Sequence, residues 1–387
     1  MVSDGFAEYC VFRFIHHGEI LNEAEVRVHK EALGSCLVST SLPYYVAKLL
    51  CLDEKAVFRY LPCLFYSLMP AFVYLIARLY LDVPLSIISA VFILSGFQFL
   101  FFPDIGRIGI AQGLMAVVLW CLLSGHITVG VLVALLLVFS HYGTSYFTVS
   151  SLGTACVILI FATNDMLVLR AVFLITLTLG LSAYIWRFVV PITIKGKSIK
   201  RKGVQTKGDQ CGSLPRDSKG MPRPHYVVER NGAVRLGTTD DAAKDRLHIL
   251  FSPKYRDPAF QVVLGRTLRS MNTPQRMELA LSWVVVAFTG FGLLTCGFGM
   301  PYVAIAYGVC FTLLLAVLKP CWGAYYAASR VYFASLTMLA PCFAVGASWL
   351  SRACGSPDWV LPAVIVVLYG MCVSGLMHRI FGINKRG

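Results

Sequence analysis

The sequence predicts an all-α polytopic membrane protein with about nine or ten transmembrane helices and one long polar loop. Two observations carry this prediction. Hydrophobic residues make up 57% of the 387 residues while charged residues make up 14%, and the mean hydropathy is +0.70. Soluble domains are less apolar and carry about 25% charged residues. The composition therefore excludes soluble, disordered, collagen-like and coiled-coil proteins.

Apolar stretches follow one another along most of the chain. A bilayer core of about 30 Å is crossed by roughly 20 apolar residues in a helix, and we expect a helix in each stretch that approaches this length. The stretches are 60–81, 84–102, 108–124, 127–141, 147–162, 167–192, 279–297, 302–318, 331–350 and 360–377. Two of them, 127–141 and 147–162, are short, so one helix broken at 140–146 is the alternative. Irregular backbone at membrane depth needs protein or water as a partner, and such a break would line a cavity.

The chain divides into four parts: an extramembrane or interfacial segment 1–55, a first helix bundle 56–192, a basic polar loop 193–278 and a second helix group 279–387. In the first part, residues 6–17 predict a short interfacial helix with aromatic residues toward lipid, or else an ordered loop. The polar loop contains most of the excess charge, which attracts anionic headgroups, and short strands are expected at 226–228 and 248–251. This distribution does not favour a nucleic-acid partner.

Thirteen cysteines are scattered along the chain without a C-x-x-C pair. Most of them stand inside apolar stretches, where cysteine behaves as a small apolar residue. Motifs of soluble enzymes are also absent from the sequence, including the P-loop, the dinucleotide fingerprint, H-E-x-x-H and G-x-S-x-G. The candidate functional residues are therefore polar side chains at the membrane face or within it, where they are costly.

The first candidate is the break between two apolar stretches that carries Asp104 and Arg107. A guanidinium suits a phosphate ligand because it donates bidentate, charge-assisted hydrogen bonds. The structural alternative is a salt bridge between these two residues. Gly109 and Gly113 follow, and small residues at this spacing predict close packing against a neighbouring helix.

The second candidate is the run Ser140-His141-Tyr142-Gly143-Thr144-Ser145-Tyr146, which follows a strongly apolar stretch. The histidine is suited to donate to a phosphate or a sugar hydroxyl, or to carry a proton near neutral pH. The alternative is a polar clasp between helices.

The third candidate is the pair Asp4 and Glu8, which share one face if this segment is helical. A carboxylate near the membrane surface can act as a general base toward a hydroxyl, although an exposed terminus often has no such role. Arg330 opens a later apolar stretch beside aromatic residues, where it is either an interfacial anchor or a phosphate ligand.

Four motifs together resemble an archaeal family of polytopic membrane proteins, domain of unknown function 2206. In order they are Val57-Phe58-Arg59-Tyr60-Leu61-Pro62 leading into Pro70-x-x-x-Tyr74, then Arg107-x-x-Ile110-Ala111, then the run 140–146, then Arg330-x-Tyr332 with Leu339-Ala340-Pro341. They cover about residues 40–350, and the run 140–146 is the most specific. That family in turn resembles the GT-C type polytopic glycosyltransferases.

The resemblance implies transfer of a sugar from a polyprenyl-phosphate carrier at the extracytoplasmic face of the cell membrane, with a carboxylate in the loop after the first span. It implies catalytic roles for Asp4 and Glu8, and binding of the lipid phosphate by Arg107, His141 and Arg330. It implies substrate contacts from Asp104, Tyr142, Thr144, Ser145 and Tyr146. The expected partners are membrane lipid and the polyprenyl-phosphate sugar donor. The sequence supports no cofactor, and a divalent metal is left as an open alternative.

The first span of such enzymes is expected to be missing here, because Asp4 follows Met1 so closely. Counting spans alternately from that point places Asp4, Arg107 and His141 at one face. Two other hypotheses remain open at this stage. One is a transporter or flippase for a lipid-linked or anionic solute, and the other is an inactive truncated scaffold.

Overall fold

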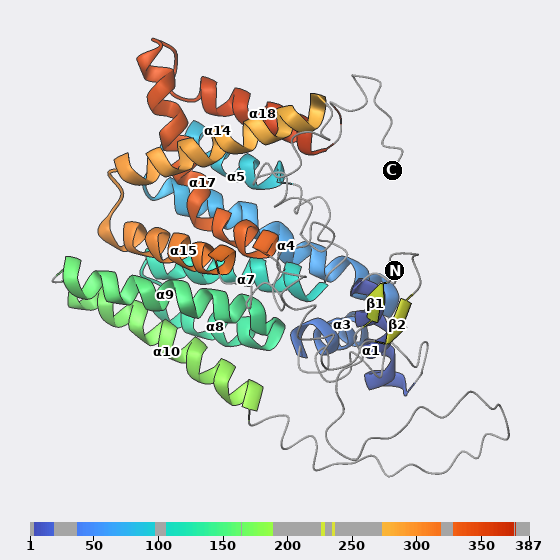
Figure 1. Ribbon diagram of the computed structural model, residues 1–387. Coiled ribbons are helices and arrows are strands. Elements are labelled where there is room, and N and C mark those ends of the chain that lie inside the picture. Colours follow the sequence, from blue (N-terminus) through green and yellow to red (C-terminus); the bar gives the residue numbers. More distant parts are fainter. Residues whose placement is uncertain are drawn as a thin grey trace, which may run out of the picture.

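The computed structural model describes residues 4–18, 37–96, 106–163, 165–188, 226–228, 234–236, 273–318, 328–374 and 376. Within these ranges the protein is a bundle of helices with one small two-stranded hairpin (Figure 1). Six of the helices are long and apolar enough to cross a membrane, and four shorter apolar helices accompany them. By helix length and composition, this is a membrane protein.

The helices of the bundle coincide with the ten apolar stretches predicted from sequence. They are α4 (Glu54–Arg78), α5 (Val83–Leu94), α7 (Gly106–Leu123), α8 (Ile127–Ser140), α9 (Tyr142–Ala162), α10 (Met166–Phe188), α14 (Thr273–Thr295), α15 (Met300–Leu318), α17 (Ala328–Ala353) and α18 (Val360–Val373). Those that meet the length criterion for a span are α4, α7, α9, α10, α14 and α17. The prediction of an all-α polytopic protein is confirmed for the described residues, and six helices, rather than the expected nine or ten, are long and apolar enough to be candidate spans.

The run 140–146 separates two helices rather than interrupting one. His141 lies between α8 and α9 in an extended conformation, with φ −159° and ψ 114°. The Ser145 hydroxyl donates to the Leu137 carbonyl at 3.3 Å, although two turns of straight helix would place these residues about 12 Å apart. The chain therefore reverses direction at His141, and α8 and α9 are separate helices.

Three helix pairs pack with their backbones in contact. A Cβ built on Gly113 of α7, Gly308 of α15 or Gly292 of α14 would lie 1.8–2.1 Å from a carbonyl oxygen of the partner helix, which is α4, α9 or α17 respectively. Only glycine permits such an approach, as in other membrane bundles. The close packing predicted at Gly113 is thus confirmed. Helices α7 and α17 lie deepest, since most of their residues are buried.

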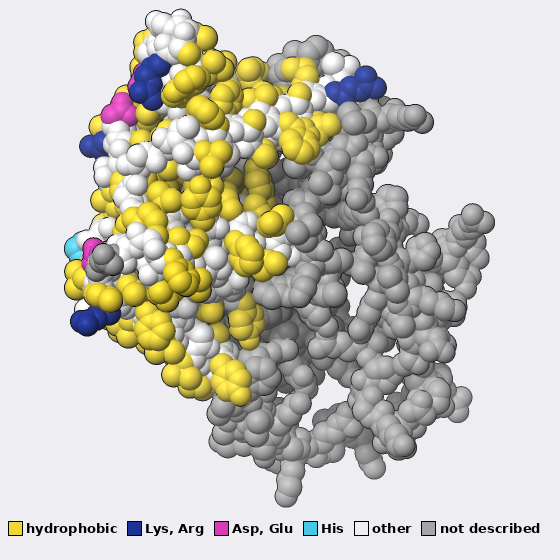
Figure 2. All heavy atoms as spheres, turned by 60° about the vertical axis from the view of Figure 1, so that its left-hand side comes forward, with side chains coloured by type: hydrophobic (Ala, Val, Ile, Leu, Met, Phe, Trp, Pro, Cys, Tyr) yellow, Lys and Arg dark blue, Asp and Glu magenta, His cyan; other side chains and the backbone are white. Residues whose placement is uncertain are grey.

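The sides of the bundle are apolar. Large side chains such as Phe161, Leu167 and Leu294 are 86%, 80% and 75% exposed. Figure 2 shows apolar side chains spread over this face, with the few charged groups mostly along its left edge and one more at the upper right. Hydrocarbon lipid is the surrounding that such a surface requires, because water would solvate it poorly.

Two further helices, α1 (Asp4–His17) and α3 (Leu37–Leu50), lie beside the beginning of α4. The helix predicted for residues 6–17 is therefore present, but the expected direction of its aromatic side chains is wrong for Phe12. This ring is fully buried against Phe58 of α4, with ring centroids 5.0 Å apart. The apolar face of α1 packs on protein, because the start of α4 offers it an aromatic partner.

The predicted polar loop 193–278 lies mostly outside the described residues. Strand β1 (Tyr226–Val228) confirms the first expected strand and pairs antiparallel with β2 (Val234–Leu236). The second expected strand, 248–251, falls outside the described residues.

Candidate functional site

The helix ends that carry the candidate residues meet at one end of the bundle. Helices α4 and α7 run parallel, because Pro62 adjoins Gly106 near their beginnings while Phe72 and Trp120 are in ring contact farther along, with centroids 5.4 Å apart. A short turn joins α7 to α8, which runs back and ends next to His141 (Figure 1). His141 therefore returns to the end at which α7 begins.

Helix α17 begins at this same end. Phe333, in its first turns, lies against Tyr66 of α4 with ring centroids 6.1 Å apart, and Arg330 precedes it by one turn. The side chain of Arg330 lies outside what the structure describes, so its contacts stay a prediction. The convergence expected from counting spans is present in the backbone.

At this end of the bundle, Glu8 of α1 forms an ion pair with Arg107 of α7. The guanidinium Nε lies 3.4 Å from Glu8 Oε1, and the two side chains are 17% and 2% exposed. The backbone N–H of Arg107 donates to Glu8 Oε2 at 3.3 Å. The carboxylate thus lies at the first turn of α7, where N–H groups lack helical acceptors and the helix dipole is positive.

Gly106 makes room for this carboxylate. A Cβ at Gly106 would lie 3.1 Å from Glu8 Oε2 and 3.1 Å from the ring of Pro62, which is tighter than ordinary van der Waals contact. Sequence reasoning expected Asp104 as a possible partner of Arg107. Asp104 lies outside the described residues, and the partner that the structure shows is Glu8.

The pair places a carboxylate beside a guanidinium at the beginning of a helix. A carboxylate can act as a general base. The guanidinium and the beginning of a helix are both anion-binding groups. The other predicted acid, Asp4, is the first residue of α1, and its side chain lies outside the described part.

The polar run at the α8–α9 junction forms a helix cap. His141 is 3% exposed, and its Nδ1 accepts a hydrogen bond from the Thr144 backbone N–H at 3.2 Å and lies 3.0 Å from Thr144 Oγ1. The Ser145 hydroxyl donates to the His141 carbonyl at 3.0 Å. These bonds support the structural alternative of a polar clasp for His141, Thr144 and Ser145.

Substrate contacts from this run stay a prediction. Tyr146 is partly exposed, while the side chain of Tyr142 lies outside the described residues. The ring of His141 uses its Nδ1 for the cap, and phosphate binding by this residue remains an expectation from the resemblance alone.

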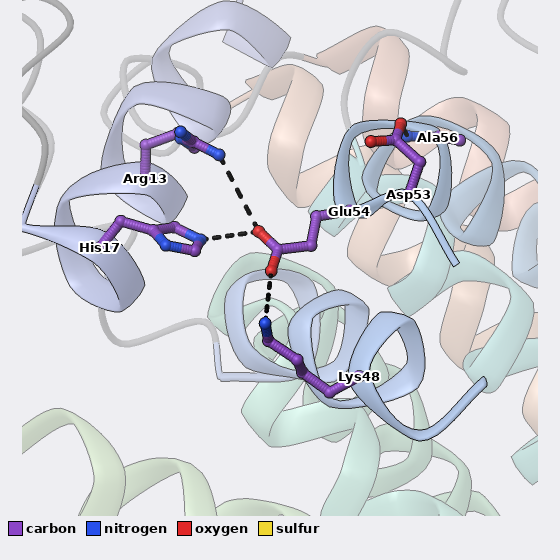
Figure 3. Close-up of polar contacts among 6 residues, drawn as sticks. All are labelled: Arg13, His17, Lys48, Asp53, Glu54 and Ala56. Carbon is purple, nitrogen blue, oxygen red and sulfur yellow. Dashed lines mark hydrogen bonds and ion pairs between the residues drawn. The ribbon is translucent and has the colours of Figure 1, made fainter. Parts of the chain in front are cut away.

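Sequence reasoning missed a second charged cluster, centred on Glu54 at the beginning of α4. Figure 3 shows two basic side chains and a histidine, from α1 and α3, pointing at its carboxylate. Oε2 lies 2.7 Å from His17 Nε2 and 3.9 Å from Arg13 Nη1, while Oε1 lies 3.4 Å from Lys48 Nζ. The sequence signal that could have indicated this cluster is Asp53-Glu54, which stands directly before an apolar stretch. Asp53 caps α4 by accepting a hydrogen bond from the Ala56 N–H at 2.8 Å, and acidic residues are favourable in the first turn of a helix.

The Glu54 cluster holds α1 in place. Two ring contacts assist it: Phe12 lies against Phe58, and His16 is stacked on Tyr44 with ring centroids 4.2 Å apart. Together these contacts fix α1 against α3 and α4. Glu8 lies on the same short helix, so these contacts also determine where its carboxylate lies.

Among the described residues, no group of three or more His, Cys, Asp or Glu side chains is placed to hold a metal ion. No protein-family model, curated protein or solved structure matches the chain. The function must be argued from the residues themselves.

Proposed function

We propose that this protein is a glycosyltransferase of the cell membrane that takes a sugar from a polyprenyl-phosphate donor and acts at the end of the bundle where Glu8 meets Arg107. The observation that carries the proposal is this pair of a buried carboxylate and a partly buried guanidinium, contributed by two residues that lie 99 positions apart in the sequence. The motif resemblance to GT-C type enzymes supports it. The apolar flanks of the bundle suit a donor whose tail lies in lipid.

In the proposed reaction, Glu8 takes the proton of an acceptor hydroxyl, whose oxygen attacks the anomeric carbon of the sugar. The bond from that carbon to the phosphate oxygen breaks, and the polyprenyl phosphate leaves with the electron pair. Arg107 stabilises the charge that develops on the phosphate. Because the Glu8 side chain is 2% exposed, an acceptor reaches it only when α1 moves away from the beginning of α7.

The first experiment measures binding of polyprenyl phosphate to the protein in nanodiscs, by native mass spectrometry or with a radiolabelled lipid. Arg107→Ala should reduce the affinity about tenfold or more, since a charge-assisted hydrogen bond contributes about 1.5–3 kcal/mol. Arg352→Ala is the matched control. Arg352 lies in the last turn of α17, at the opposite end of the bundle, and pairs with Asp358 at 3.6 Å.

The second experiment measures transfer from polyprenyl-phosphate-linked radiolabelled sugars. Glu8→Gln keeps the shape of the side chain and removes the base, so it should abolish transfer while phosphate binding remains. Full phosphate binding by Arg107→Ala, or full transfer by Glu8→Gln, would refute the assigned roles.

Transport of a lipid-linked or anionic solute is the second candidate, and the observation that favours it is Gln112. Its side chain is fully buried, and within the described part of the chain neither of its amide atoms has a hydrogen-bond partner. It lies five residues after Arg107 on α7, about 7.5 Å deeper along the axis. Polar groups beyond the charged end are a feature of transport paths.

The two functions are separated by flipping in proteoliposomes. A transporter moves a fluorescent polyprenyl phosphate across the bilayer without a sugar acceptor, and Gln112→Leu should slow that movement. A transferase releases polyprenyl phosphate only when an acceptor is present.

A further inference from the structure

A second chemical feature lies at the opposite end of the bundle, where α14 leads into α15. The backbone of α14 touches α17 at Gly292, because a Cβ there would lie 1.8 Å from the Cys342 carbonyl oxygen. Cys296 lies one turn beyond this contact, since its N–H donates to the Gly292 carbonyl at 2.8 Å. The contact therefore places the backbone of Cys342 about one helical turn from Cys296, although 46 positions separate them in the sequence.

The two thiols interact directly. The thiol of Cys342 is the side chain that most influences the Cys296 thiol, and both are free cysteines. Cys296 is partly exposed at the helix end while Cys342 is buried. The hydroxyl of Tyr302 lies 3.7 Å from Cys342 Sγ and donates to the Met338 carbonyl, so it borders the pair on the inner side.

The surroundings make Cys296 the more reactive of the two toward an oxidant. The hydrogen bond from Cys342 lowers the pKa of the Cys296 thiol to about 7, against an opposing effect of burial, and backbone hydrogen bonds from Phe298 and Cys296 assist. A larger thiolate fraction and partial exposure are the two conditions for oxidation of a cysteine.

We propose that Cys296 and Cys342 form a redox site, in which a hydroperoxide converts the two thiols into a disulfide that fastens the α14–α15 connection to α17. The geometry carries this inference, because a disulfide requires Cα atoms within about 7 Å and the backbones of α14 and α17 already touch one turn away.

The chemistry balances with the hydroperoxide as the only oxidant. The Cys296 thiolate attacks a peroxide oxygen, the O–O bond breaks, and Cys296 becomes a sulfenic acid while the other oxygen leaves as an alcohol or water. Cys342 then attacks the Cys296 sulfur, the S–O bond breaks, and a second water leaves with the thiol proton. The two sulfurs lose two electrons in total, and the peroxide oxygens gain them.

The test uses the full chain in nanodiscs. Fully reduced protein is treated with hydrogen peroxide, its remaining thiols are blocked with N-ethylmaleimide, and the digested peptides are identified by mass spectrometry. The expected product is a peptide pair joined through Cys296 and Cys342, lighter by two hydrogens and separated again by dithiothreitol. A matched control is Cys354→Ser, which removes an exposed thiol and should leave the linkage intact, whereas Cys296→Ser should abolish it.

A second measurement keeps the proposal testable if Cys296→Ser folds poorly. When the unaltered protein is treated with peroxide and then unfolded for labelling, Cys296 and Cys342 should be lost from maleimide labelling in equal amounts, while Cys310 is still labelled. Continued labelling of both thiols would overturn the proposal. Accumulation of sulfinic acid at Cys296, or its linkage to another cysteine, would overturn it as well.

Discussion

The close contact between α14 and α17 permits a sharp prediction, because α14 offers two glycines in different surroundings. A Cβ added at Gly292 would lie 1.8 Å from the Cys342 carbonyl oxygen and 2.8 Å from the Gly346 nitrogen. These are backbone atoms, which cannot rotate away as a side chain does. At Gly290, among the described residues, nothing lies within 4 Å of such a Cβ.

Substitution by alanine is expected to raise the stability of the fold at Gly290 and to lower it at Gly292. Both substitutions remove the entropic cost of glycine in a helix, which favours folding by about 0.5–1 kcal/mol. At Gly292 the new methyl group is about 1.6 Å short of the 3.4 Å of ordinary contact, so α14 and α17 must separate. Overpacking of this kind costs about 1–3 kcal/mol, so the net effect of Gly292→Ala is a loss of up to about 2.5 kcal/mol.

The assay is unfolding of each purified variant by a denaturing detergent, followed by circular dichroism. Gly290→Ala should unfold at a higher detergent fraction than the unaltered protein, and Gly292→Ala at a lower one. Equal midpoints for the two variants, or a stabilised Gly292→Ala, would contradict the backbone contact described here.

Three further predictions use the same unfolding measurement. His141→Ala removes the cap of α9 and should lower the free energy of unfolding by about 0.5–2 kcal/mol. The loss should exceed that of His126→Ala, since His126 makes no side-chain cap to α8 in the described structure. Equal losses for the two variants would contradict the cap. Thr312→Val removes a hydroxyl that contacts two serine hydroxyls of α9 at 3.2 and 3.3 Å, and should cost about 0.6–1.7 kcal/mol. Glu54→Gln should cost under about 1 kcal/mol near physiological salt and more at low salt, and a loss that does not change with salt would argue against ion pairing.

The sequence predicted which residues belong to the candidate site but not which of them contact one another. Glu8, Arg107 and His141 were each singled out because charged and polar groups are costly beside hydrocarbon. Their partners could not be predicted. Arg107 was expected to form a salt bridge with Asp104, and the sequence around His141 was also compatible with one broken helix. The partners of Glu54, which are Arg13, His17 and Lys48, come from two other helices. No local sequence pattern could therefore predict them.

The sequence by itself determined where the helices lie, because a segment in lipid must satisfy its backbone hydrogen bonds internally and must be apolar over a sufficient length. Both requirements are local, and each of the ten stretches contains a helix among its described residues. Tertiary structure alone decided which side chains meet. Contacts such as Glu8 with Arg107 and Cys296 with Cys342 depend on how helices rotate and cross, and these crossings are set by close backbone contacts at a few glycines, whose partners lie far away in the chain.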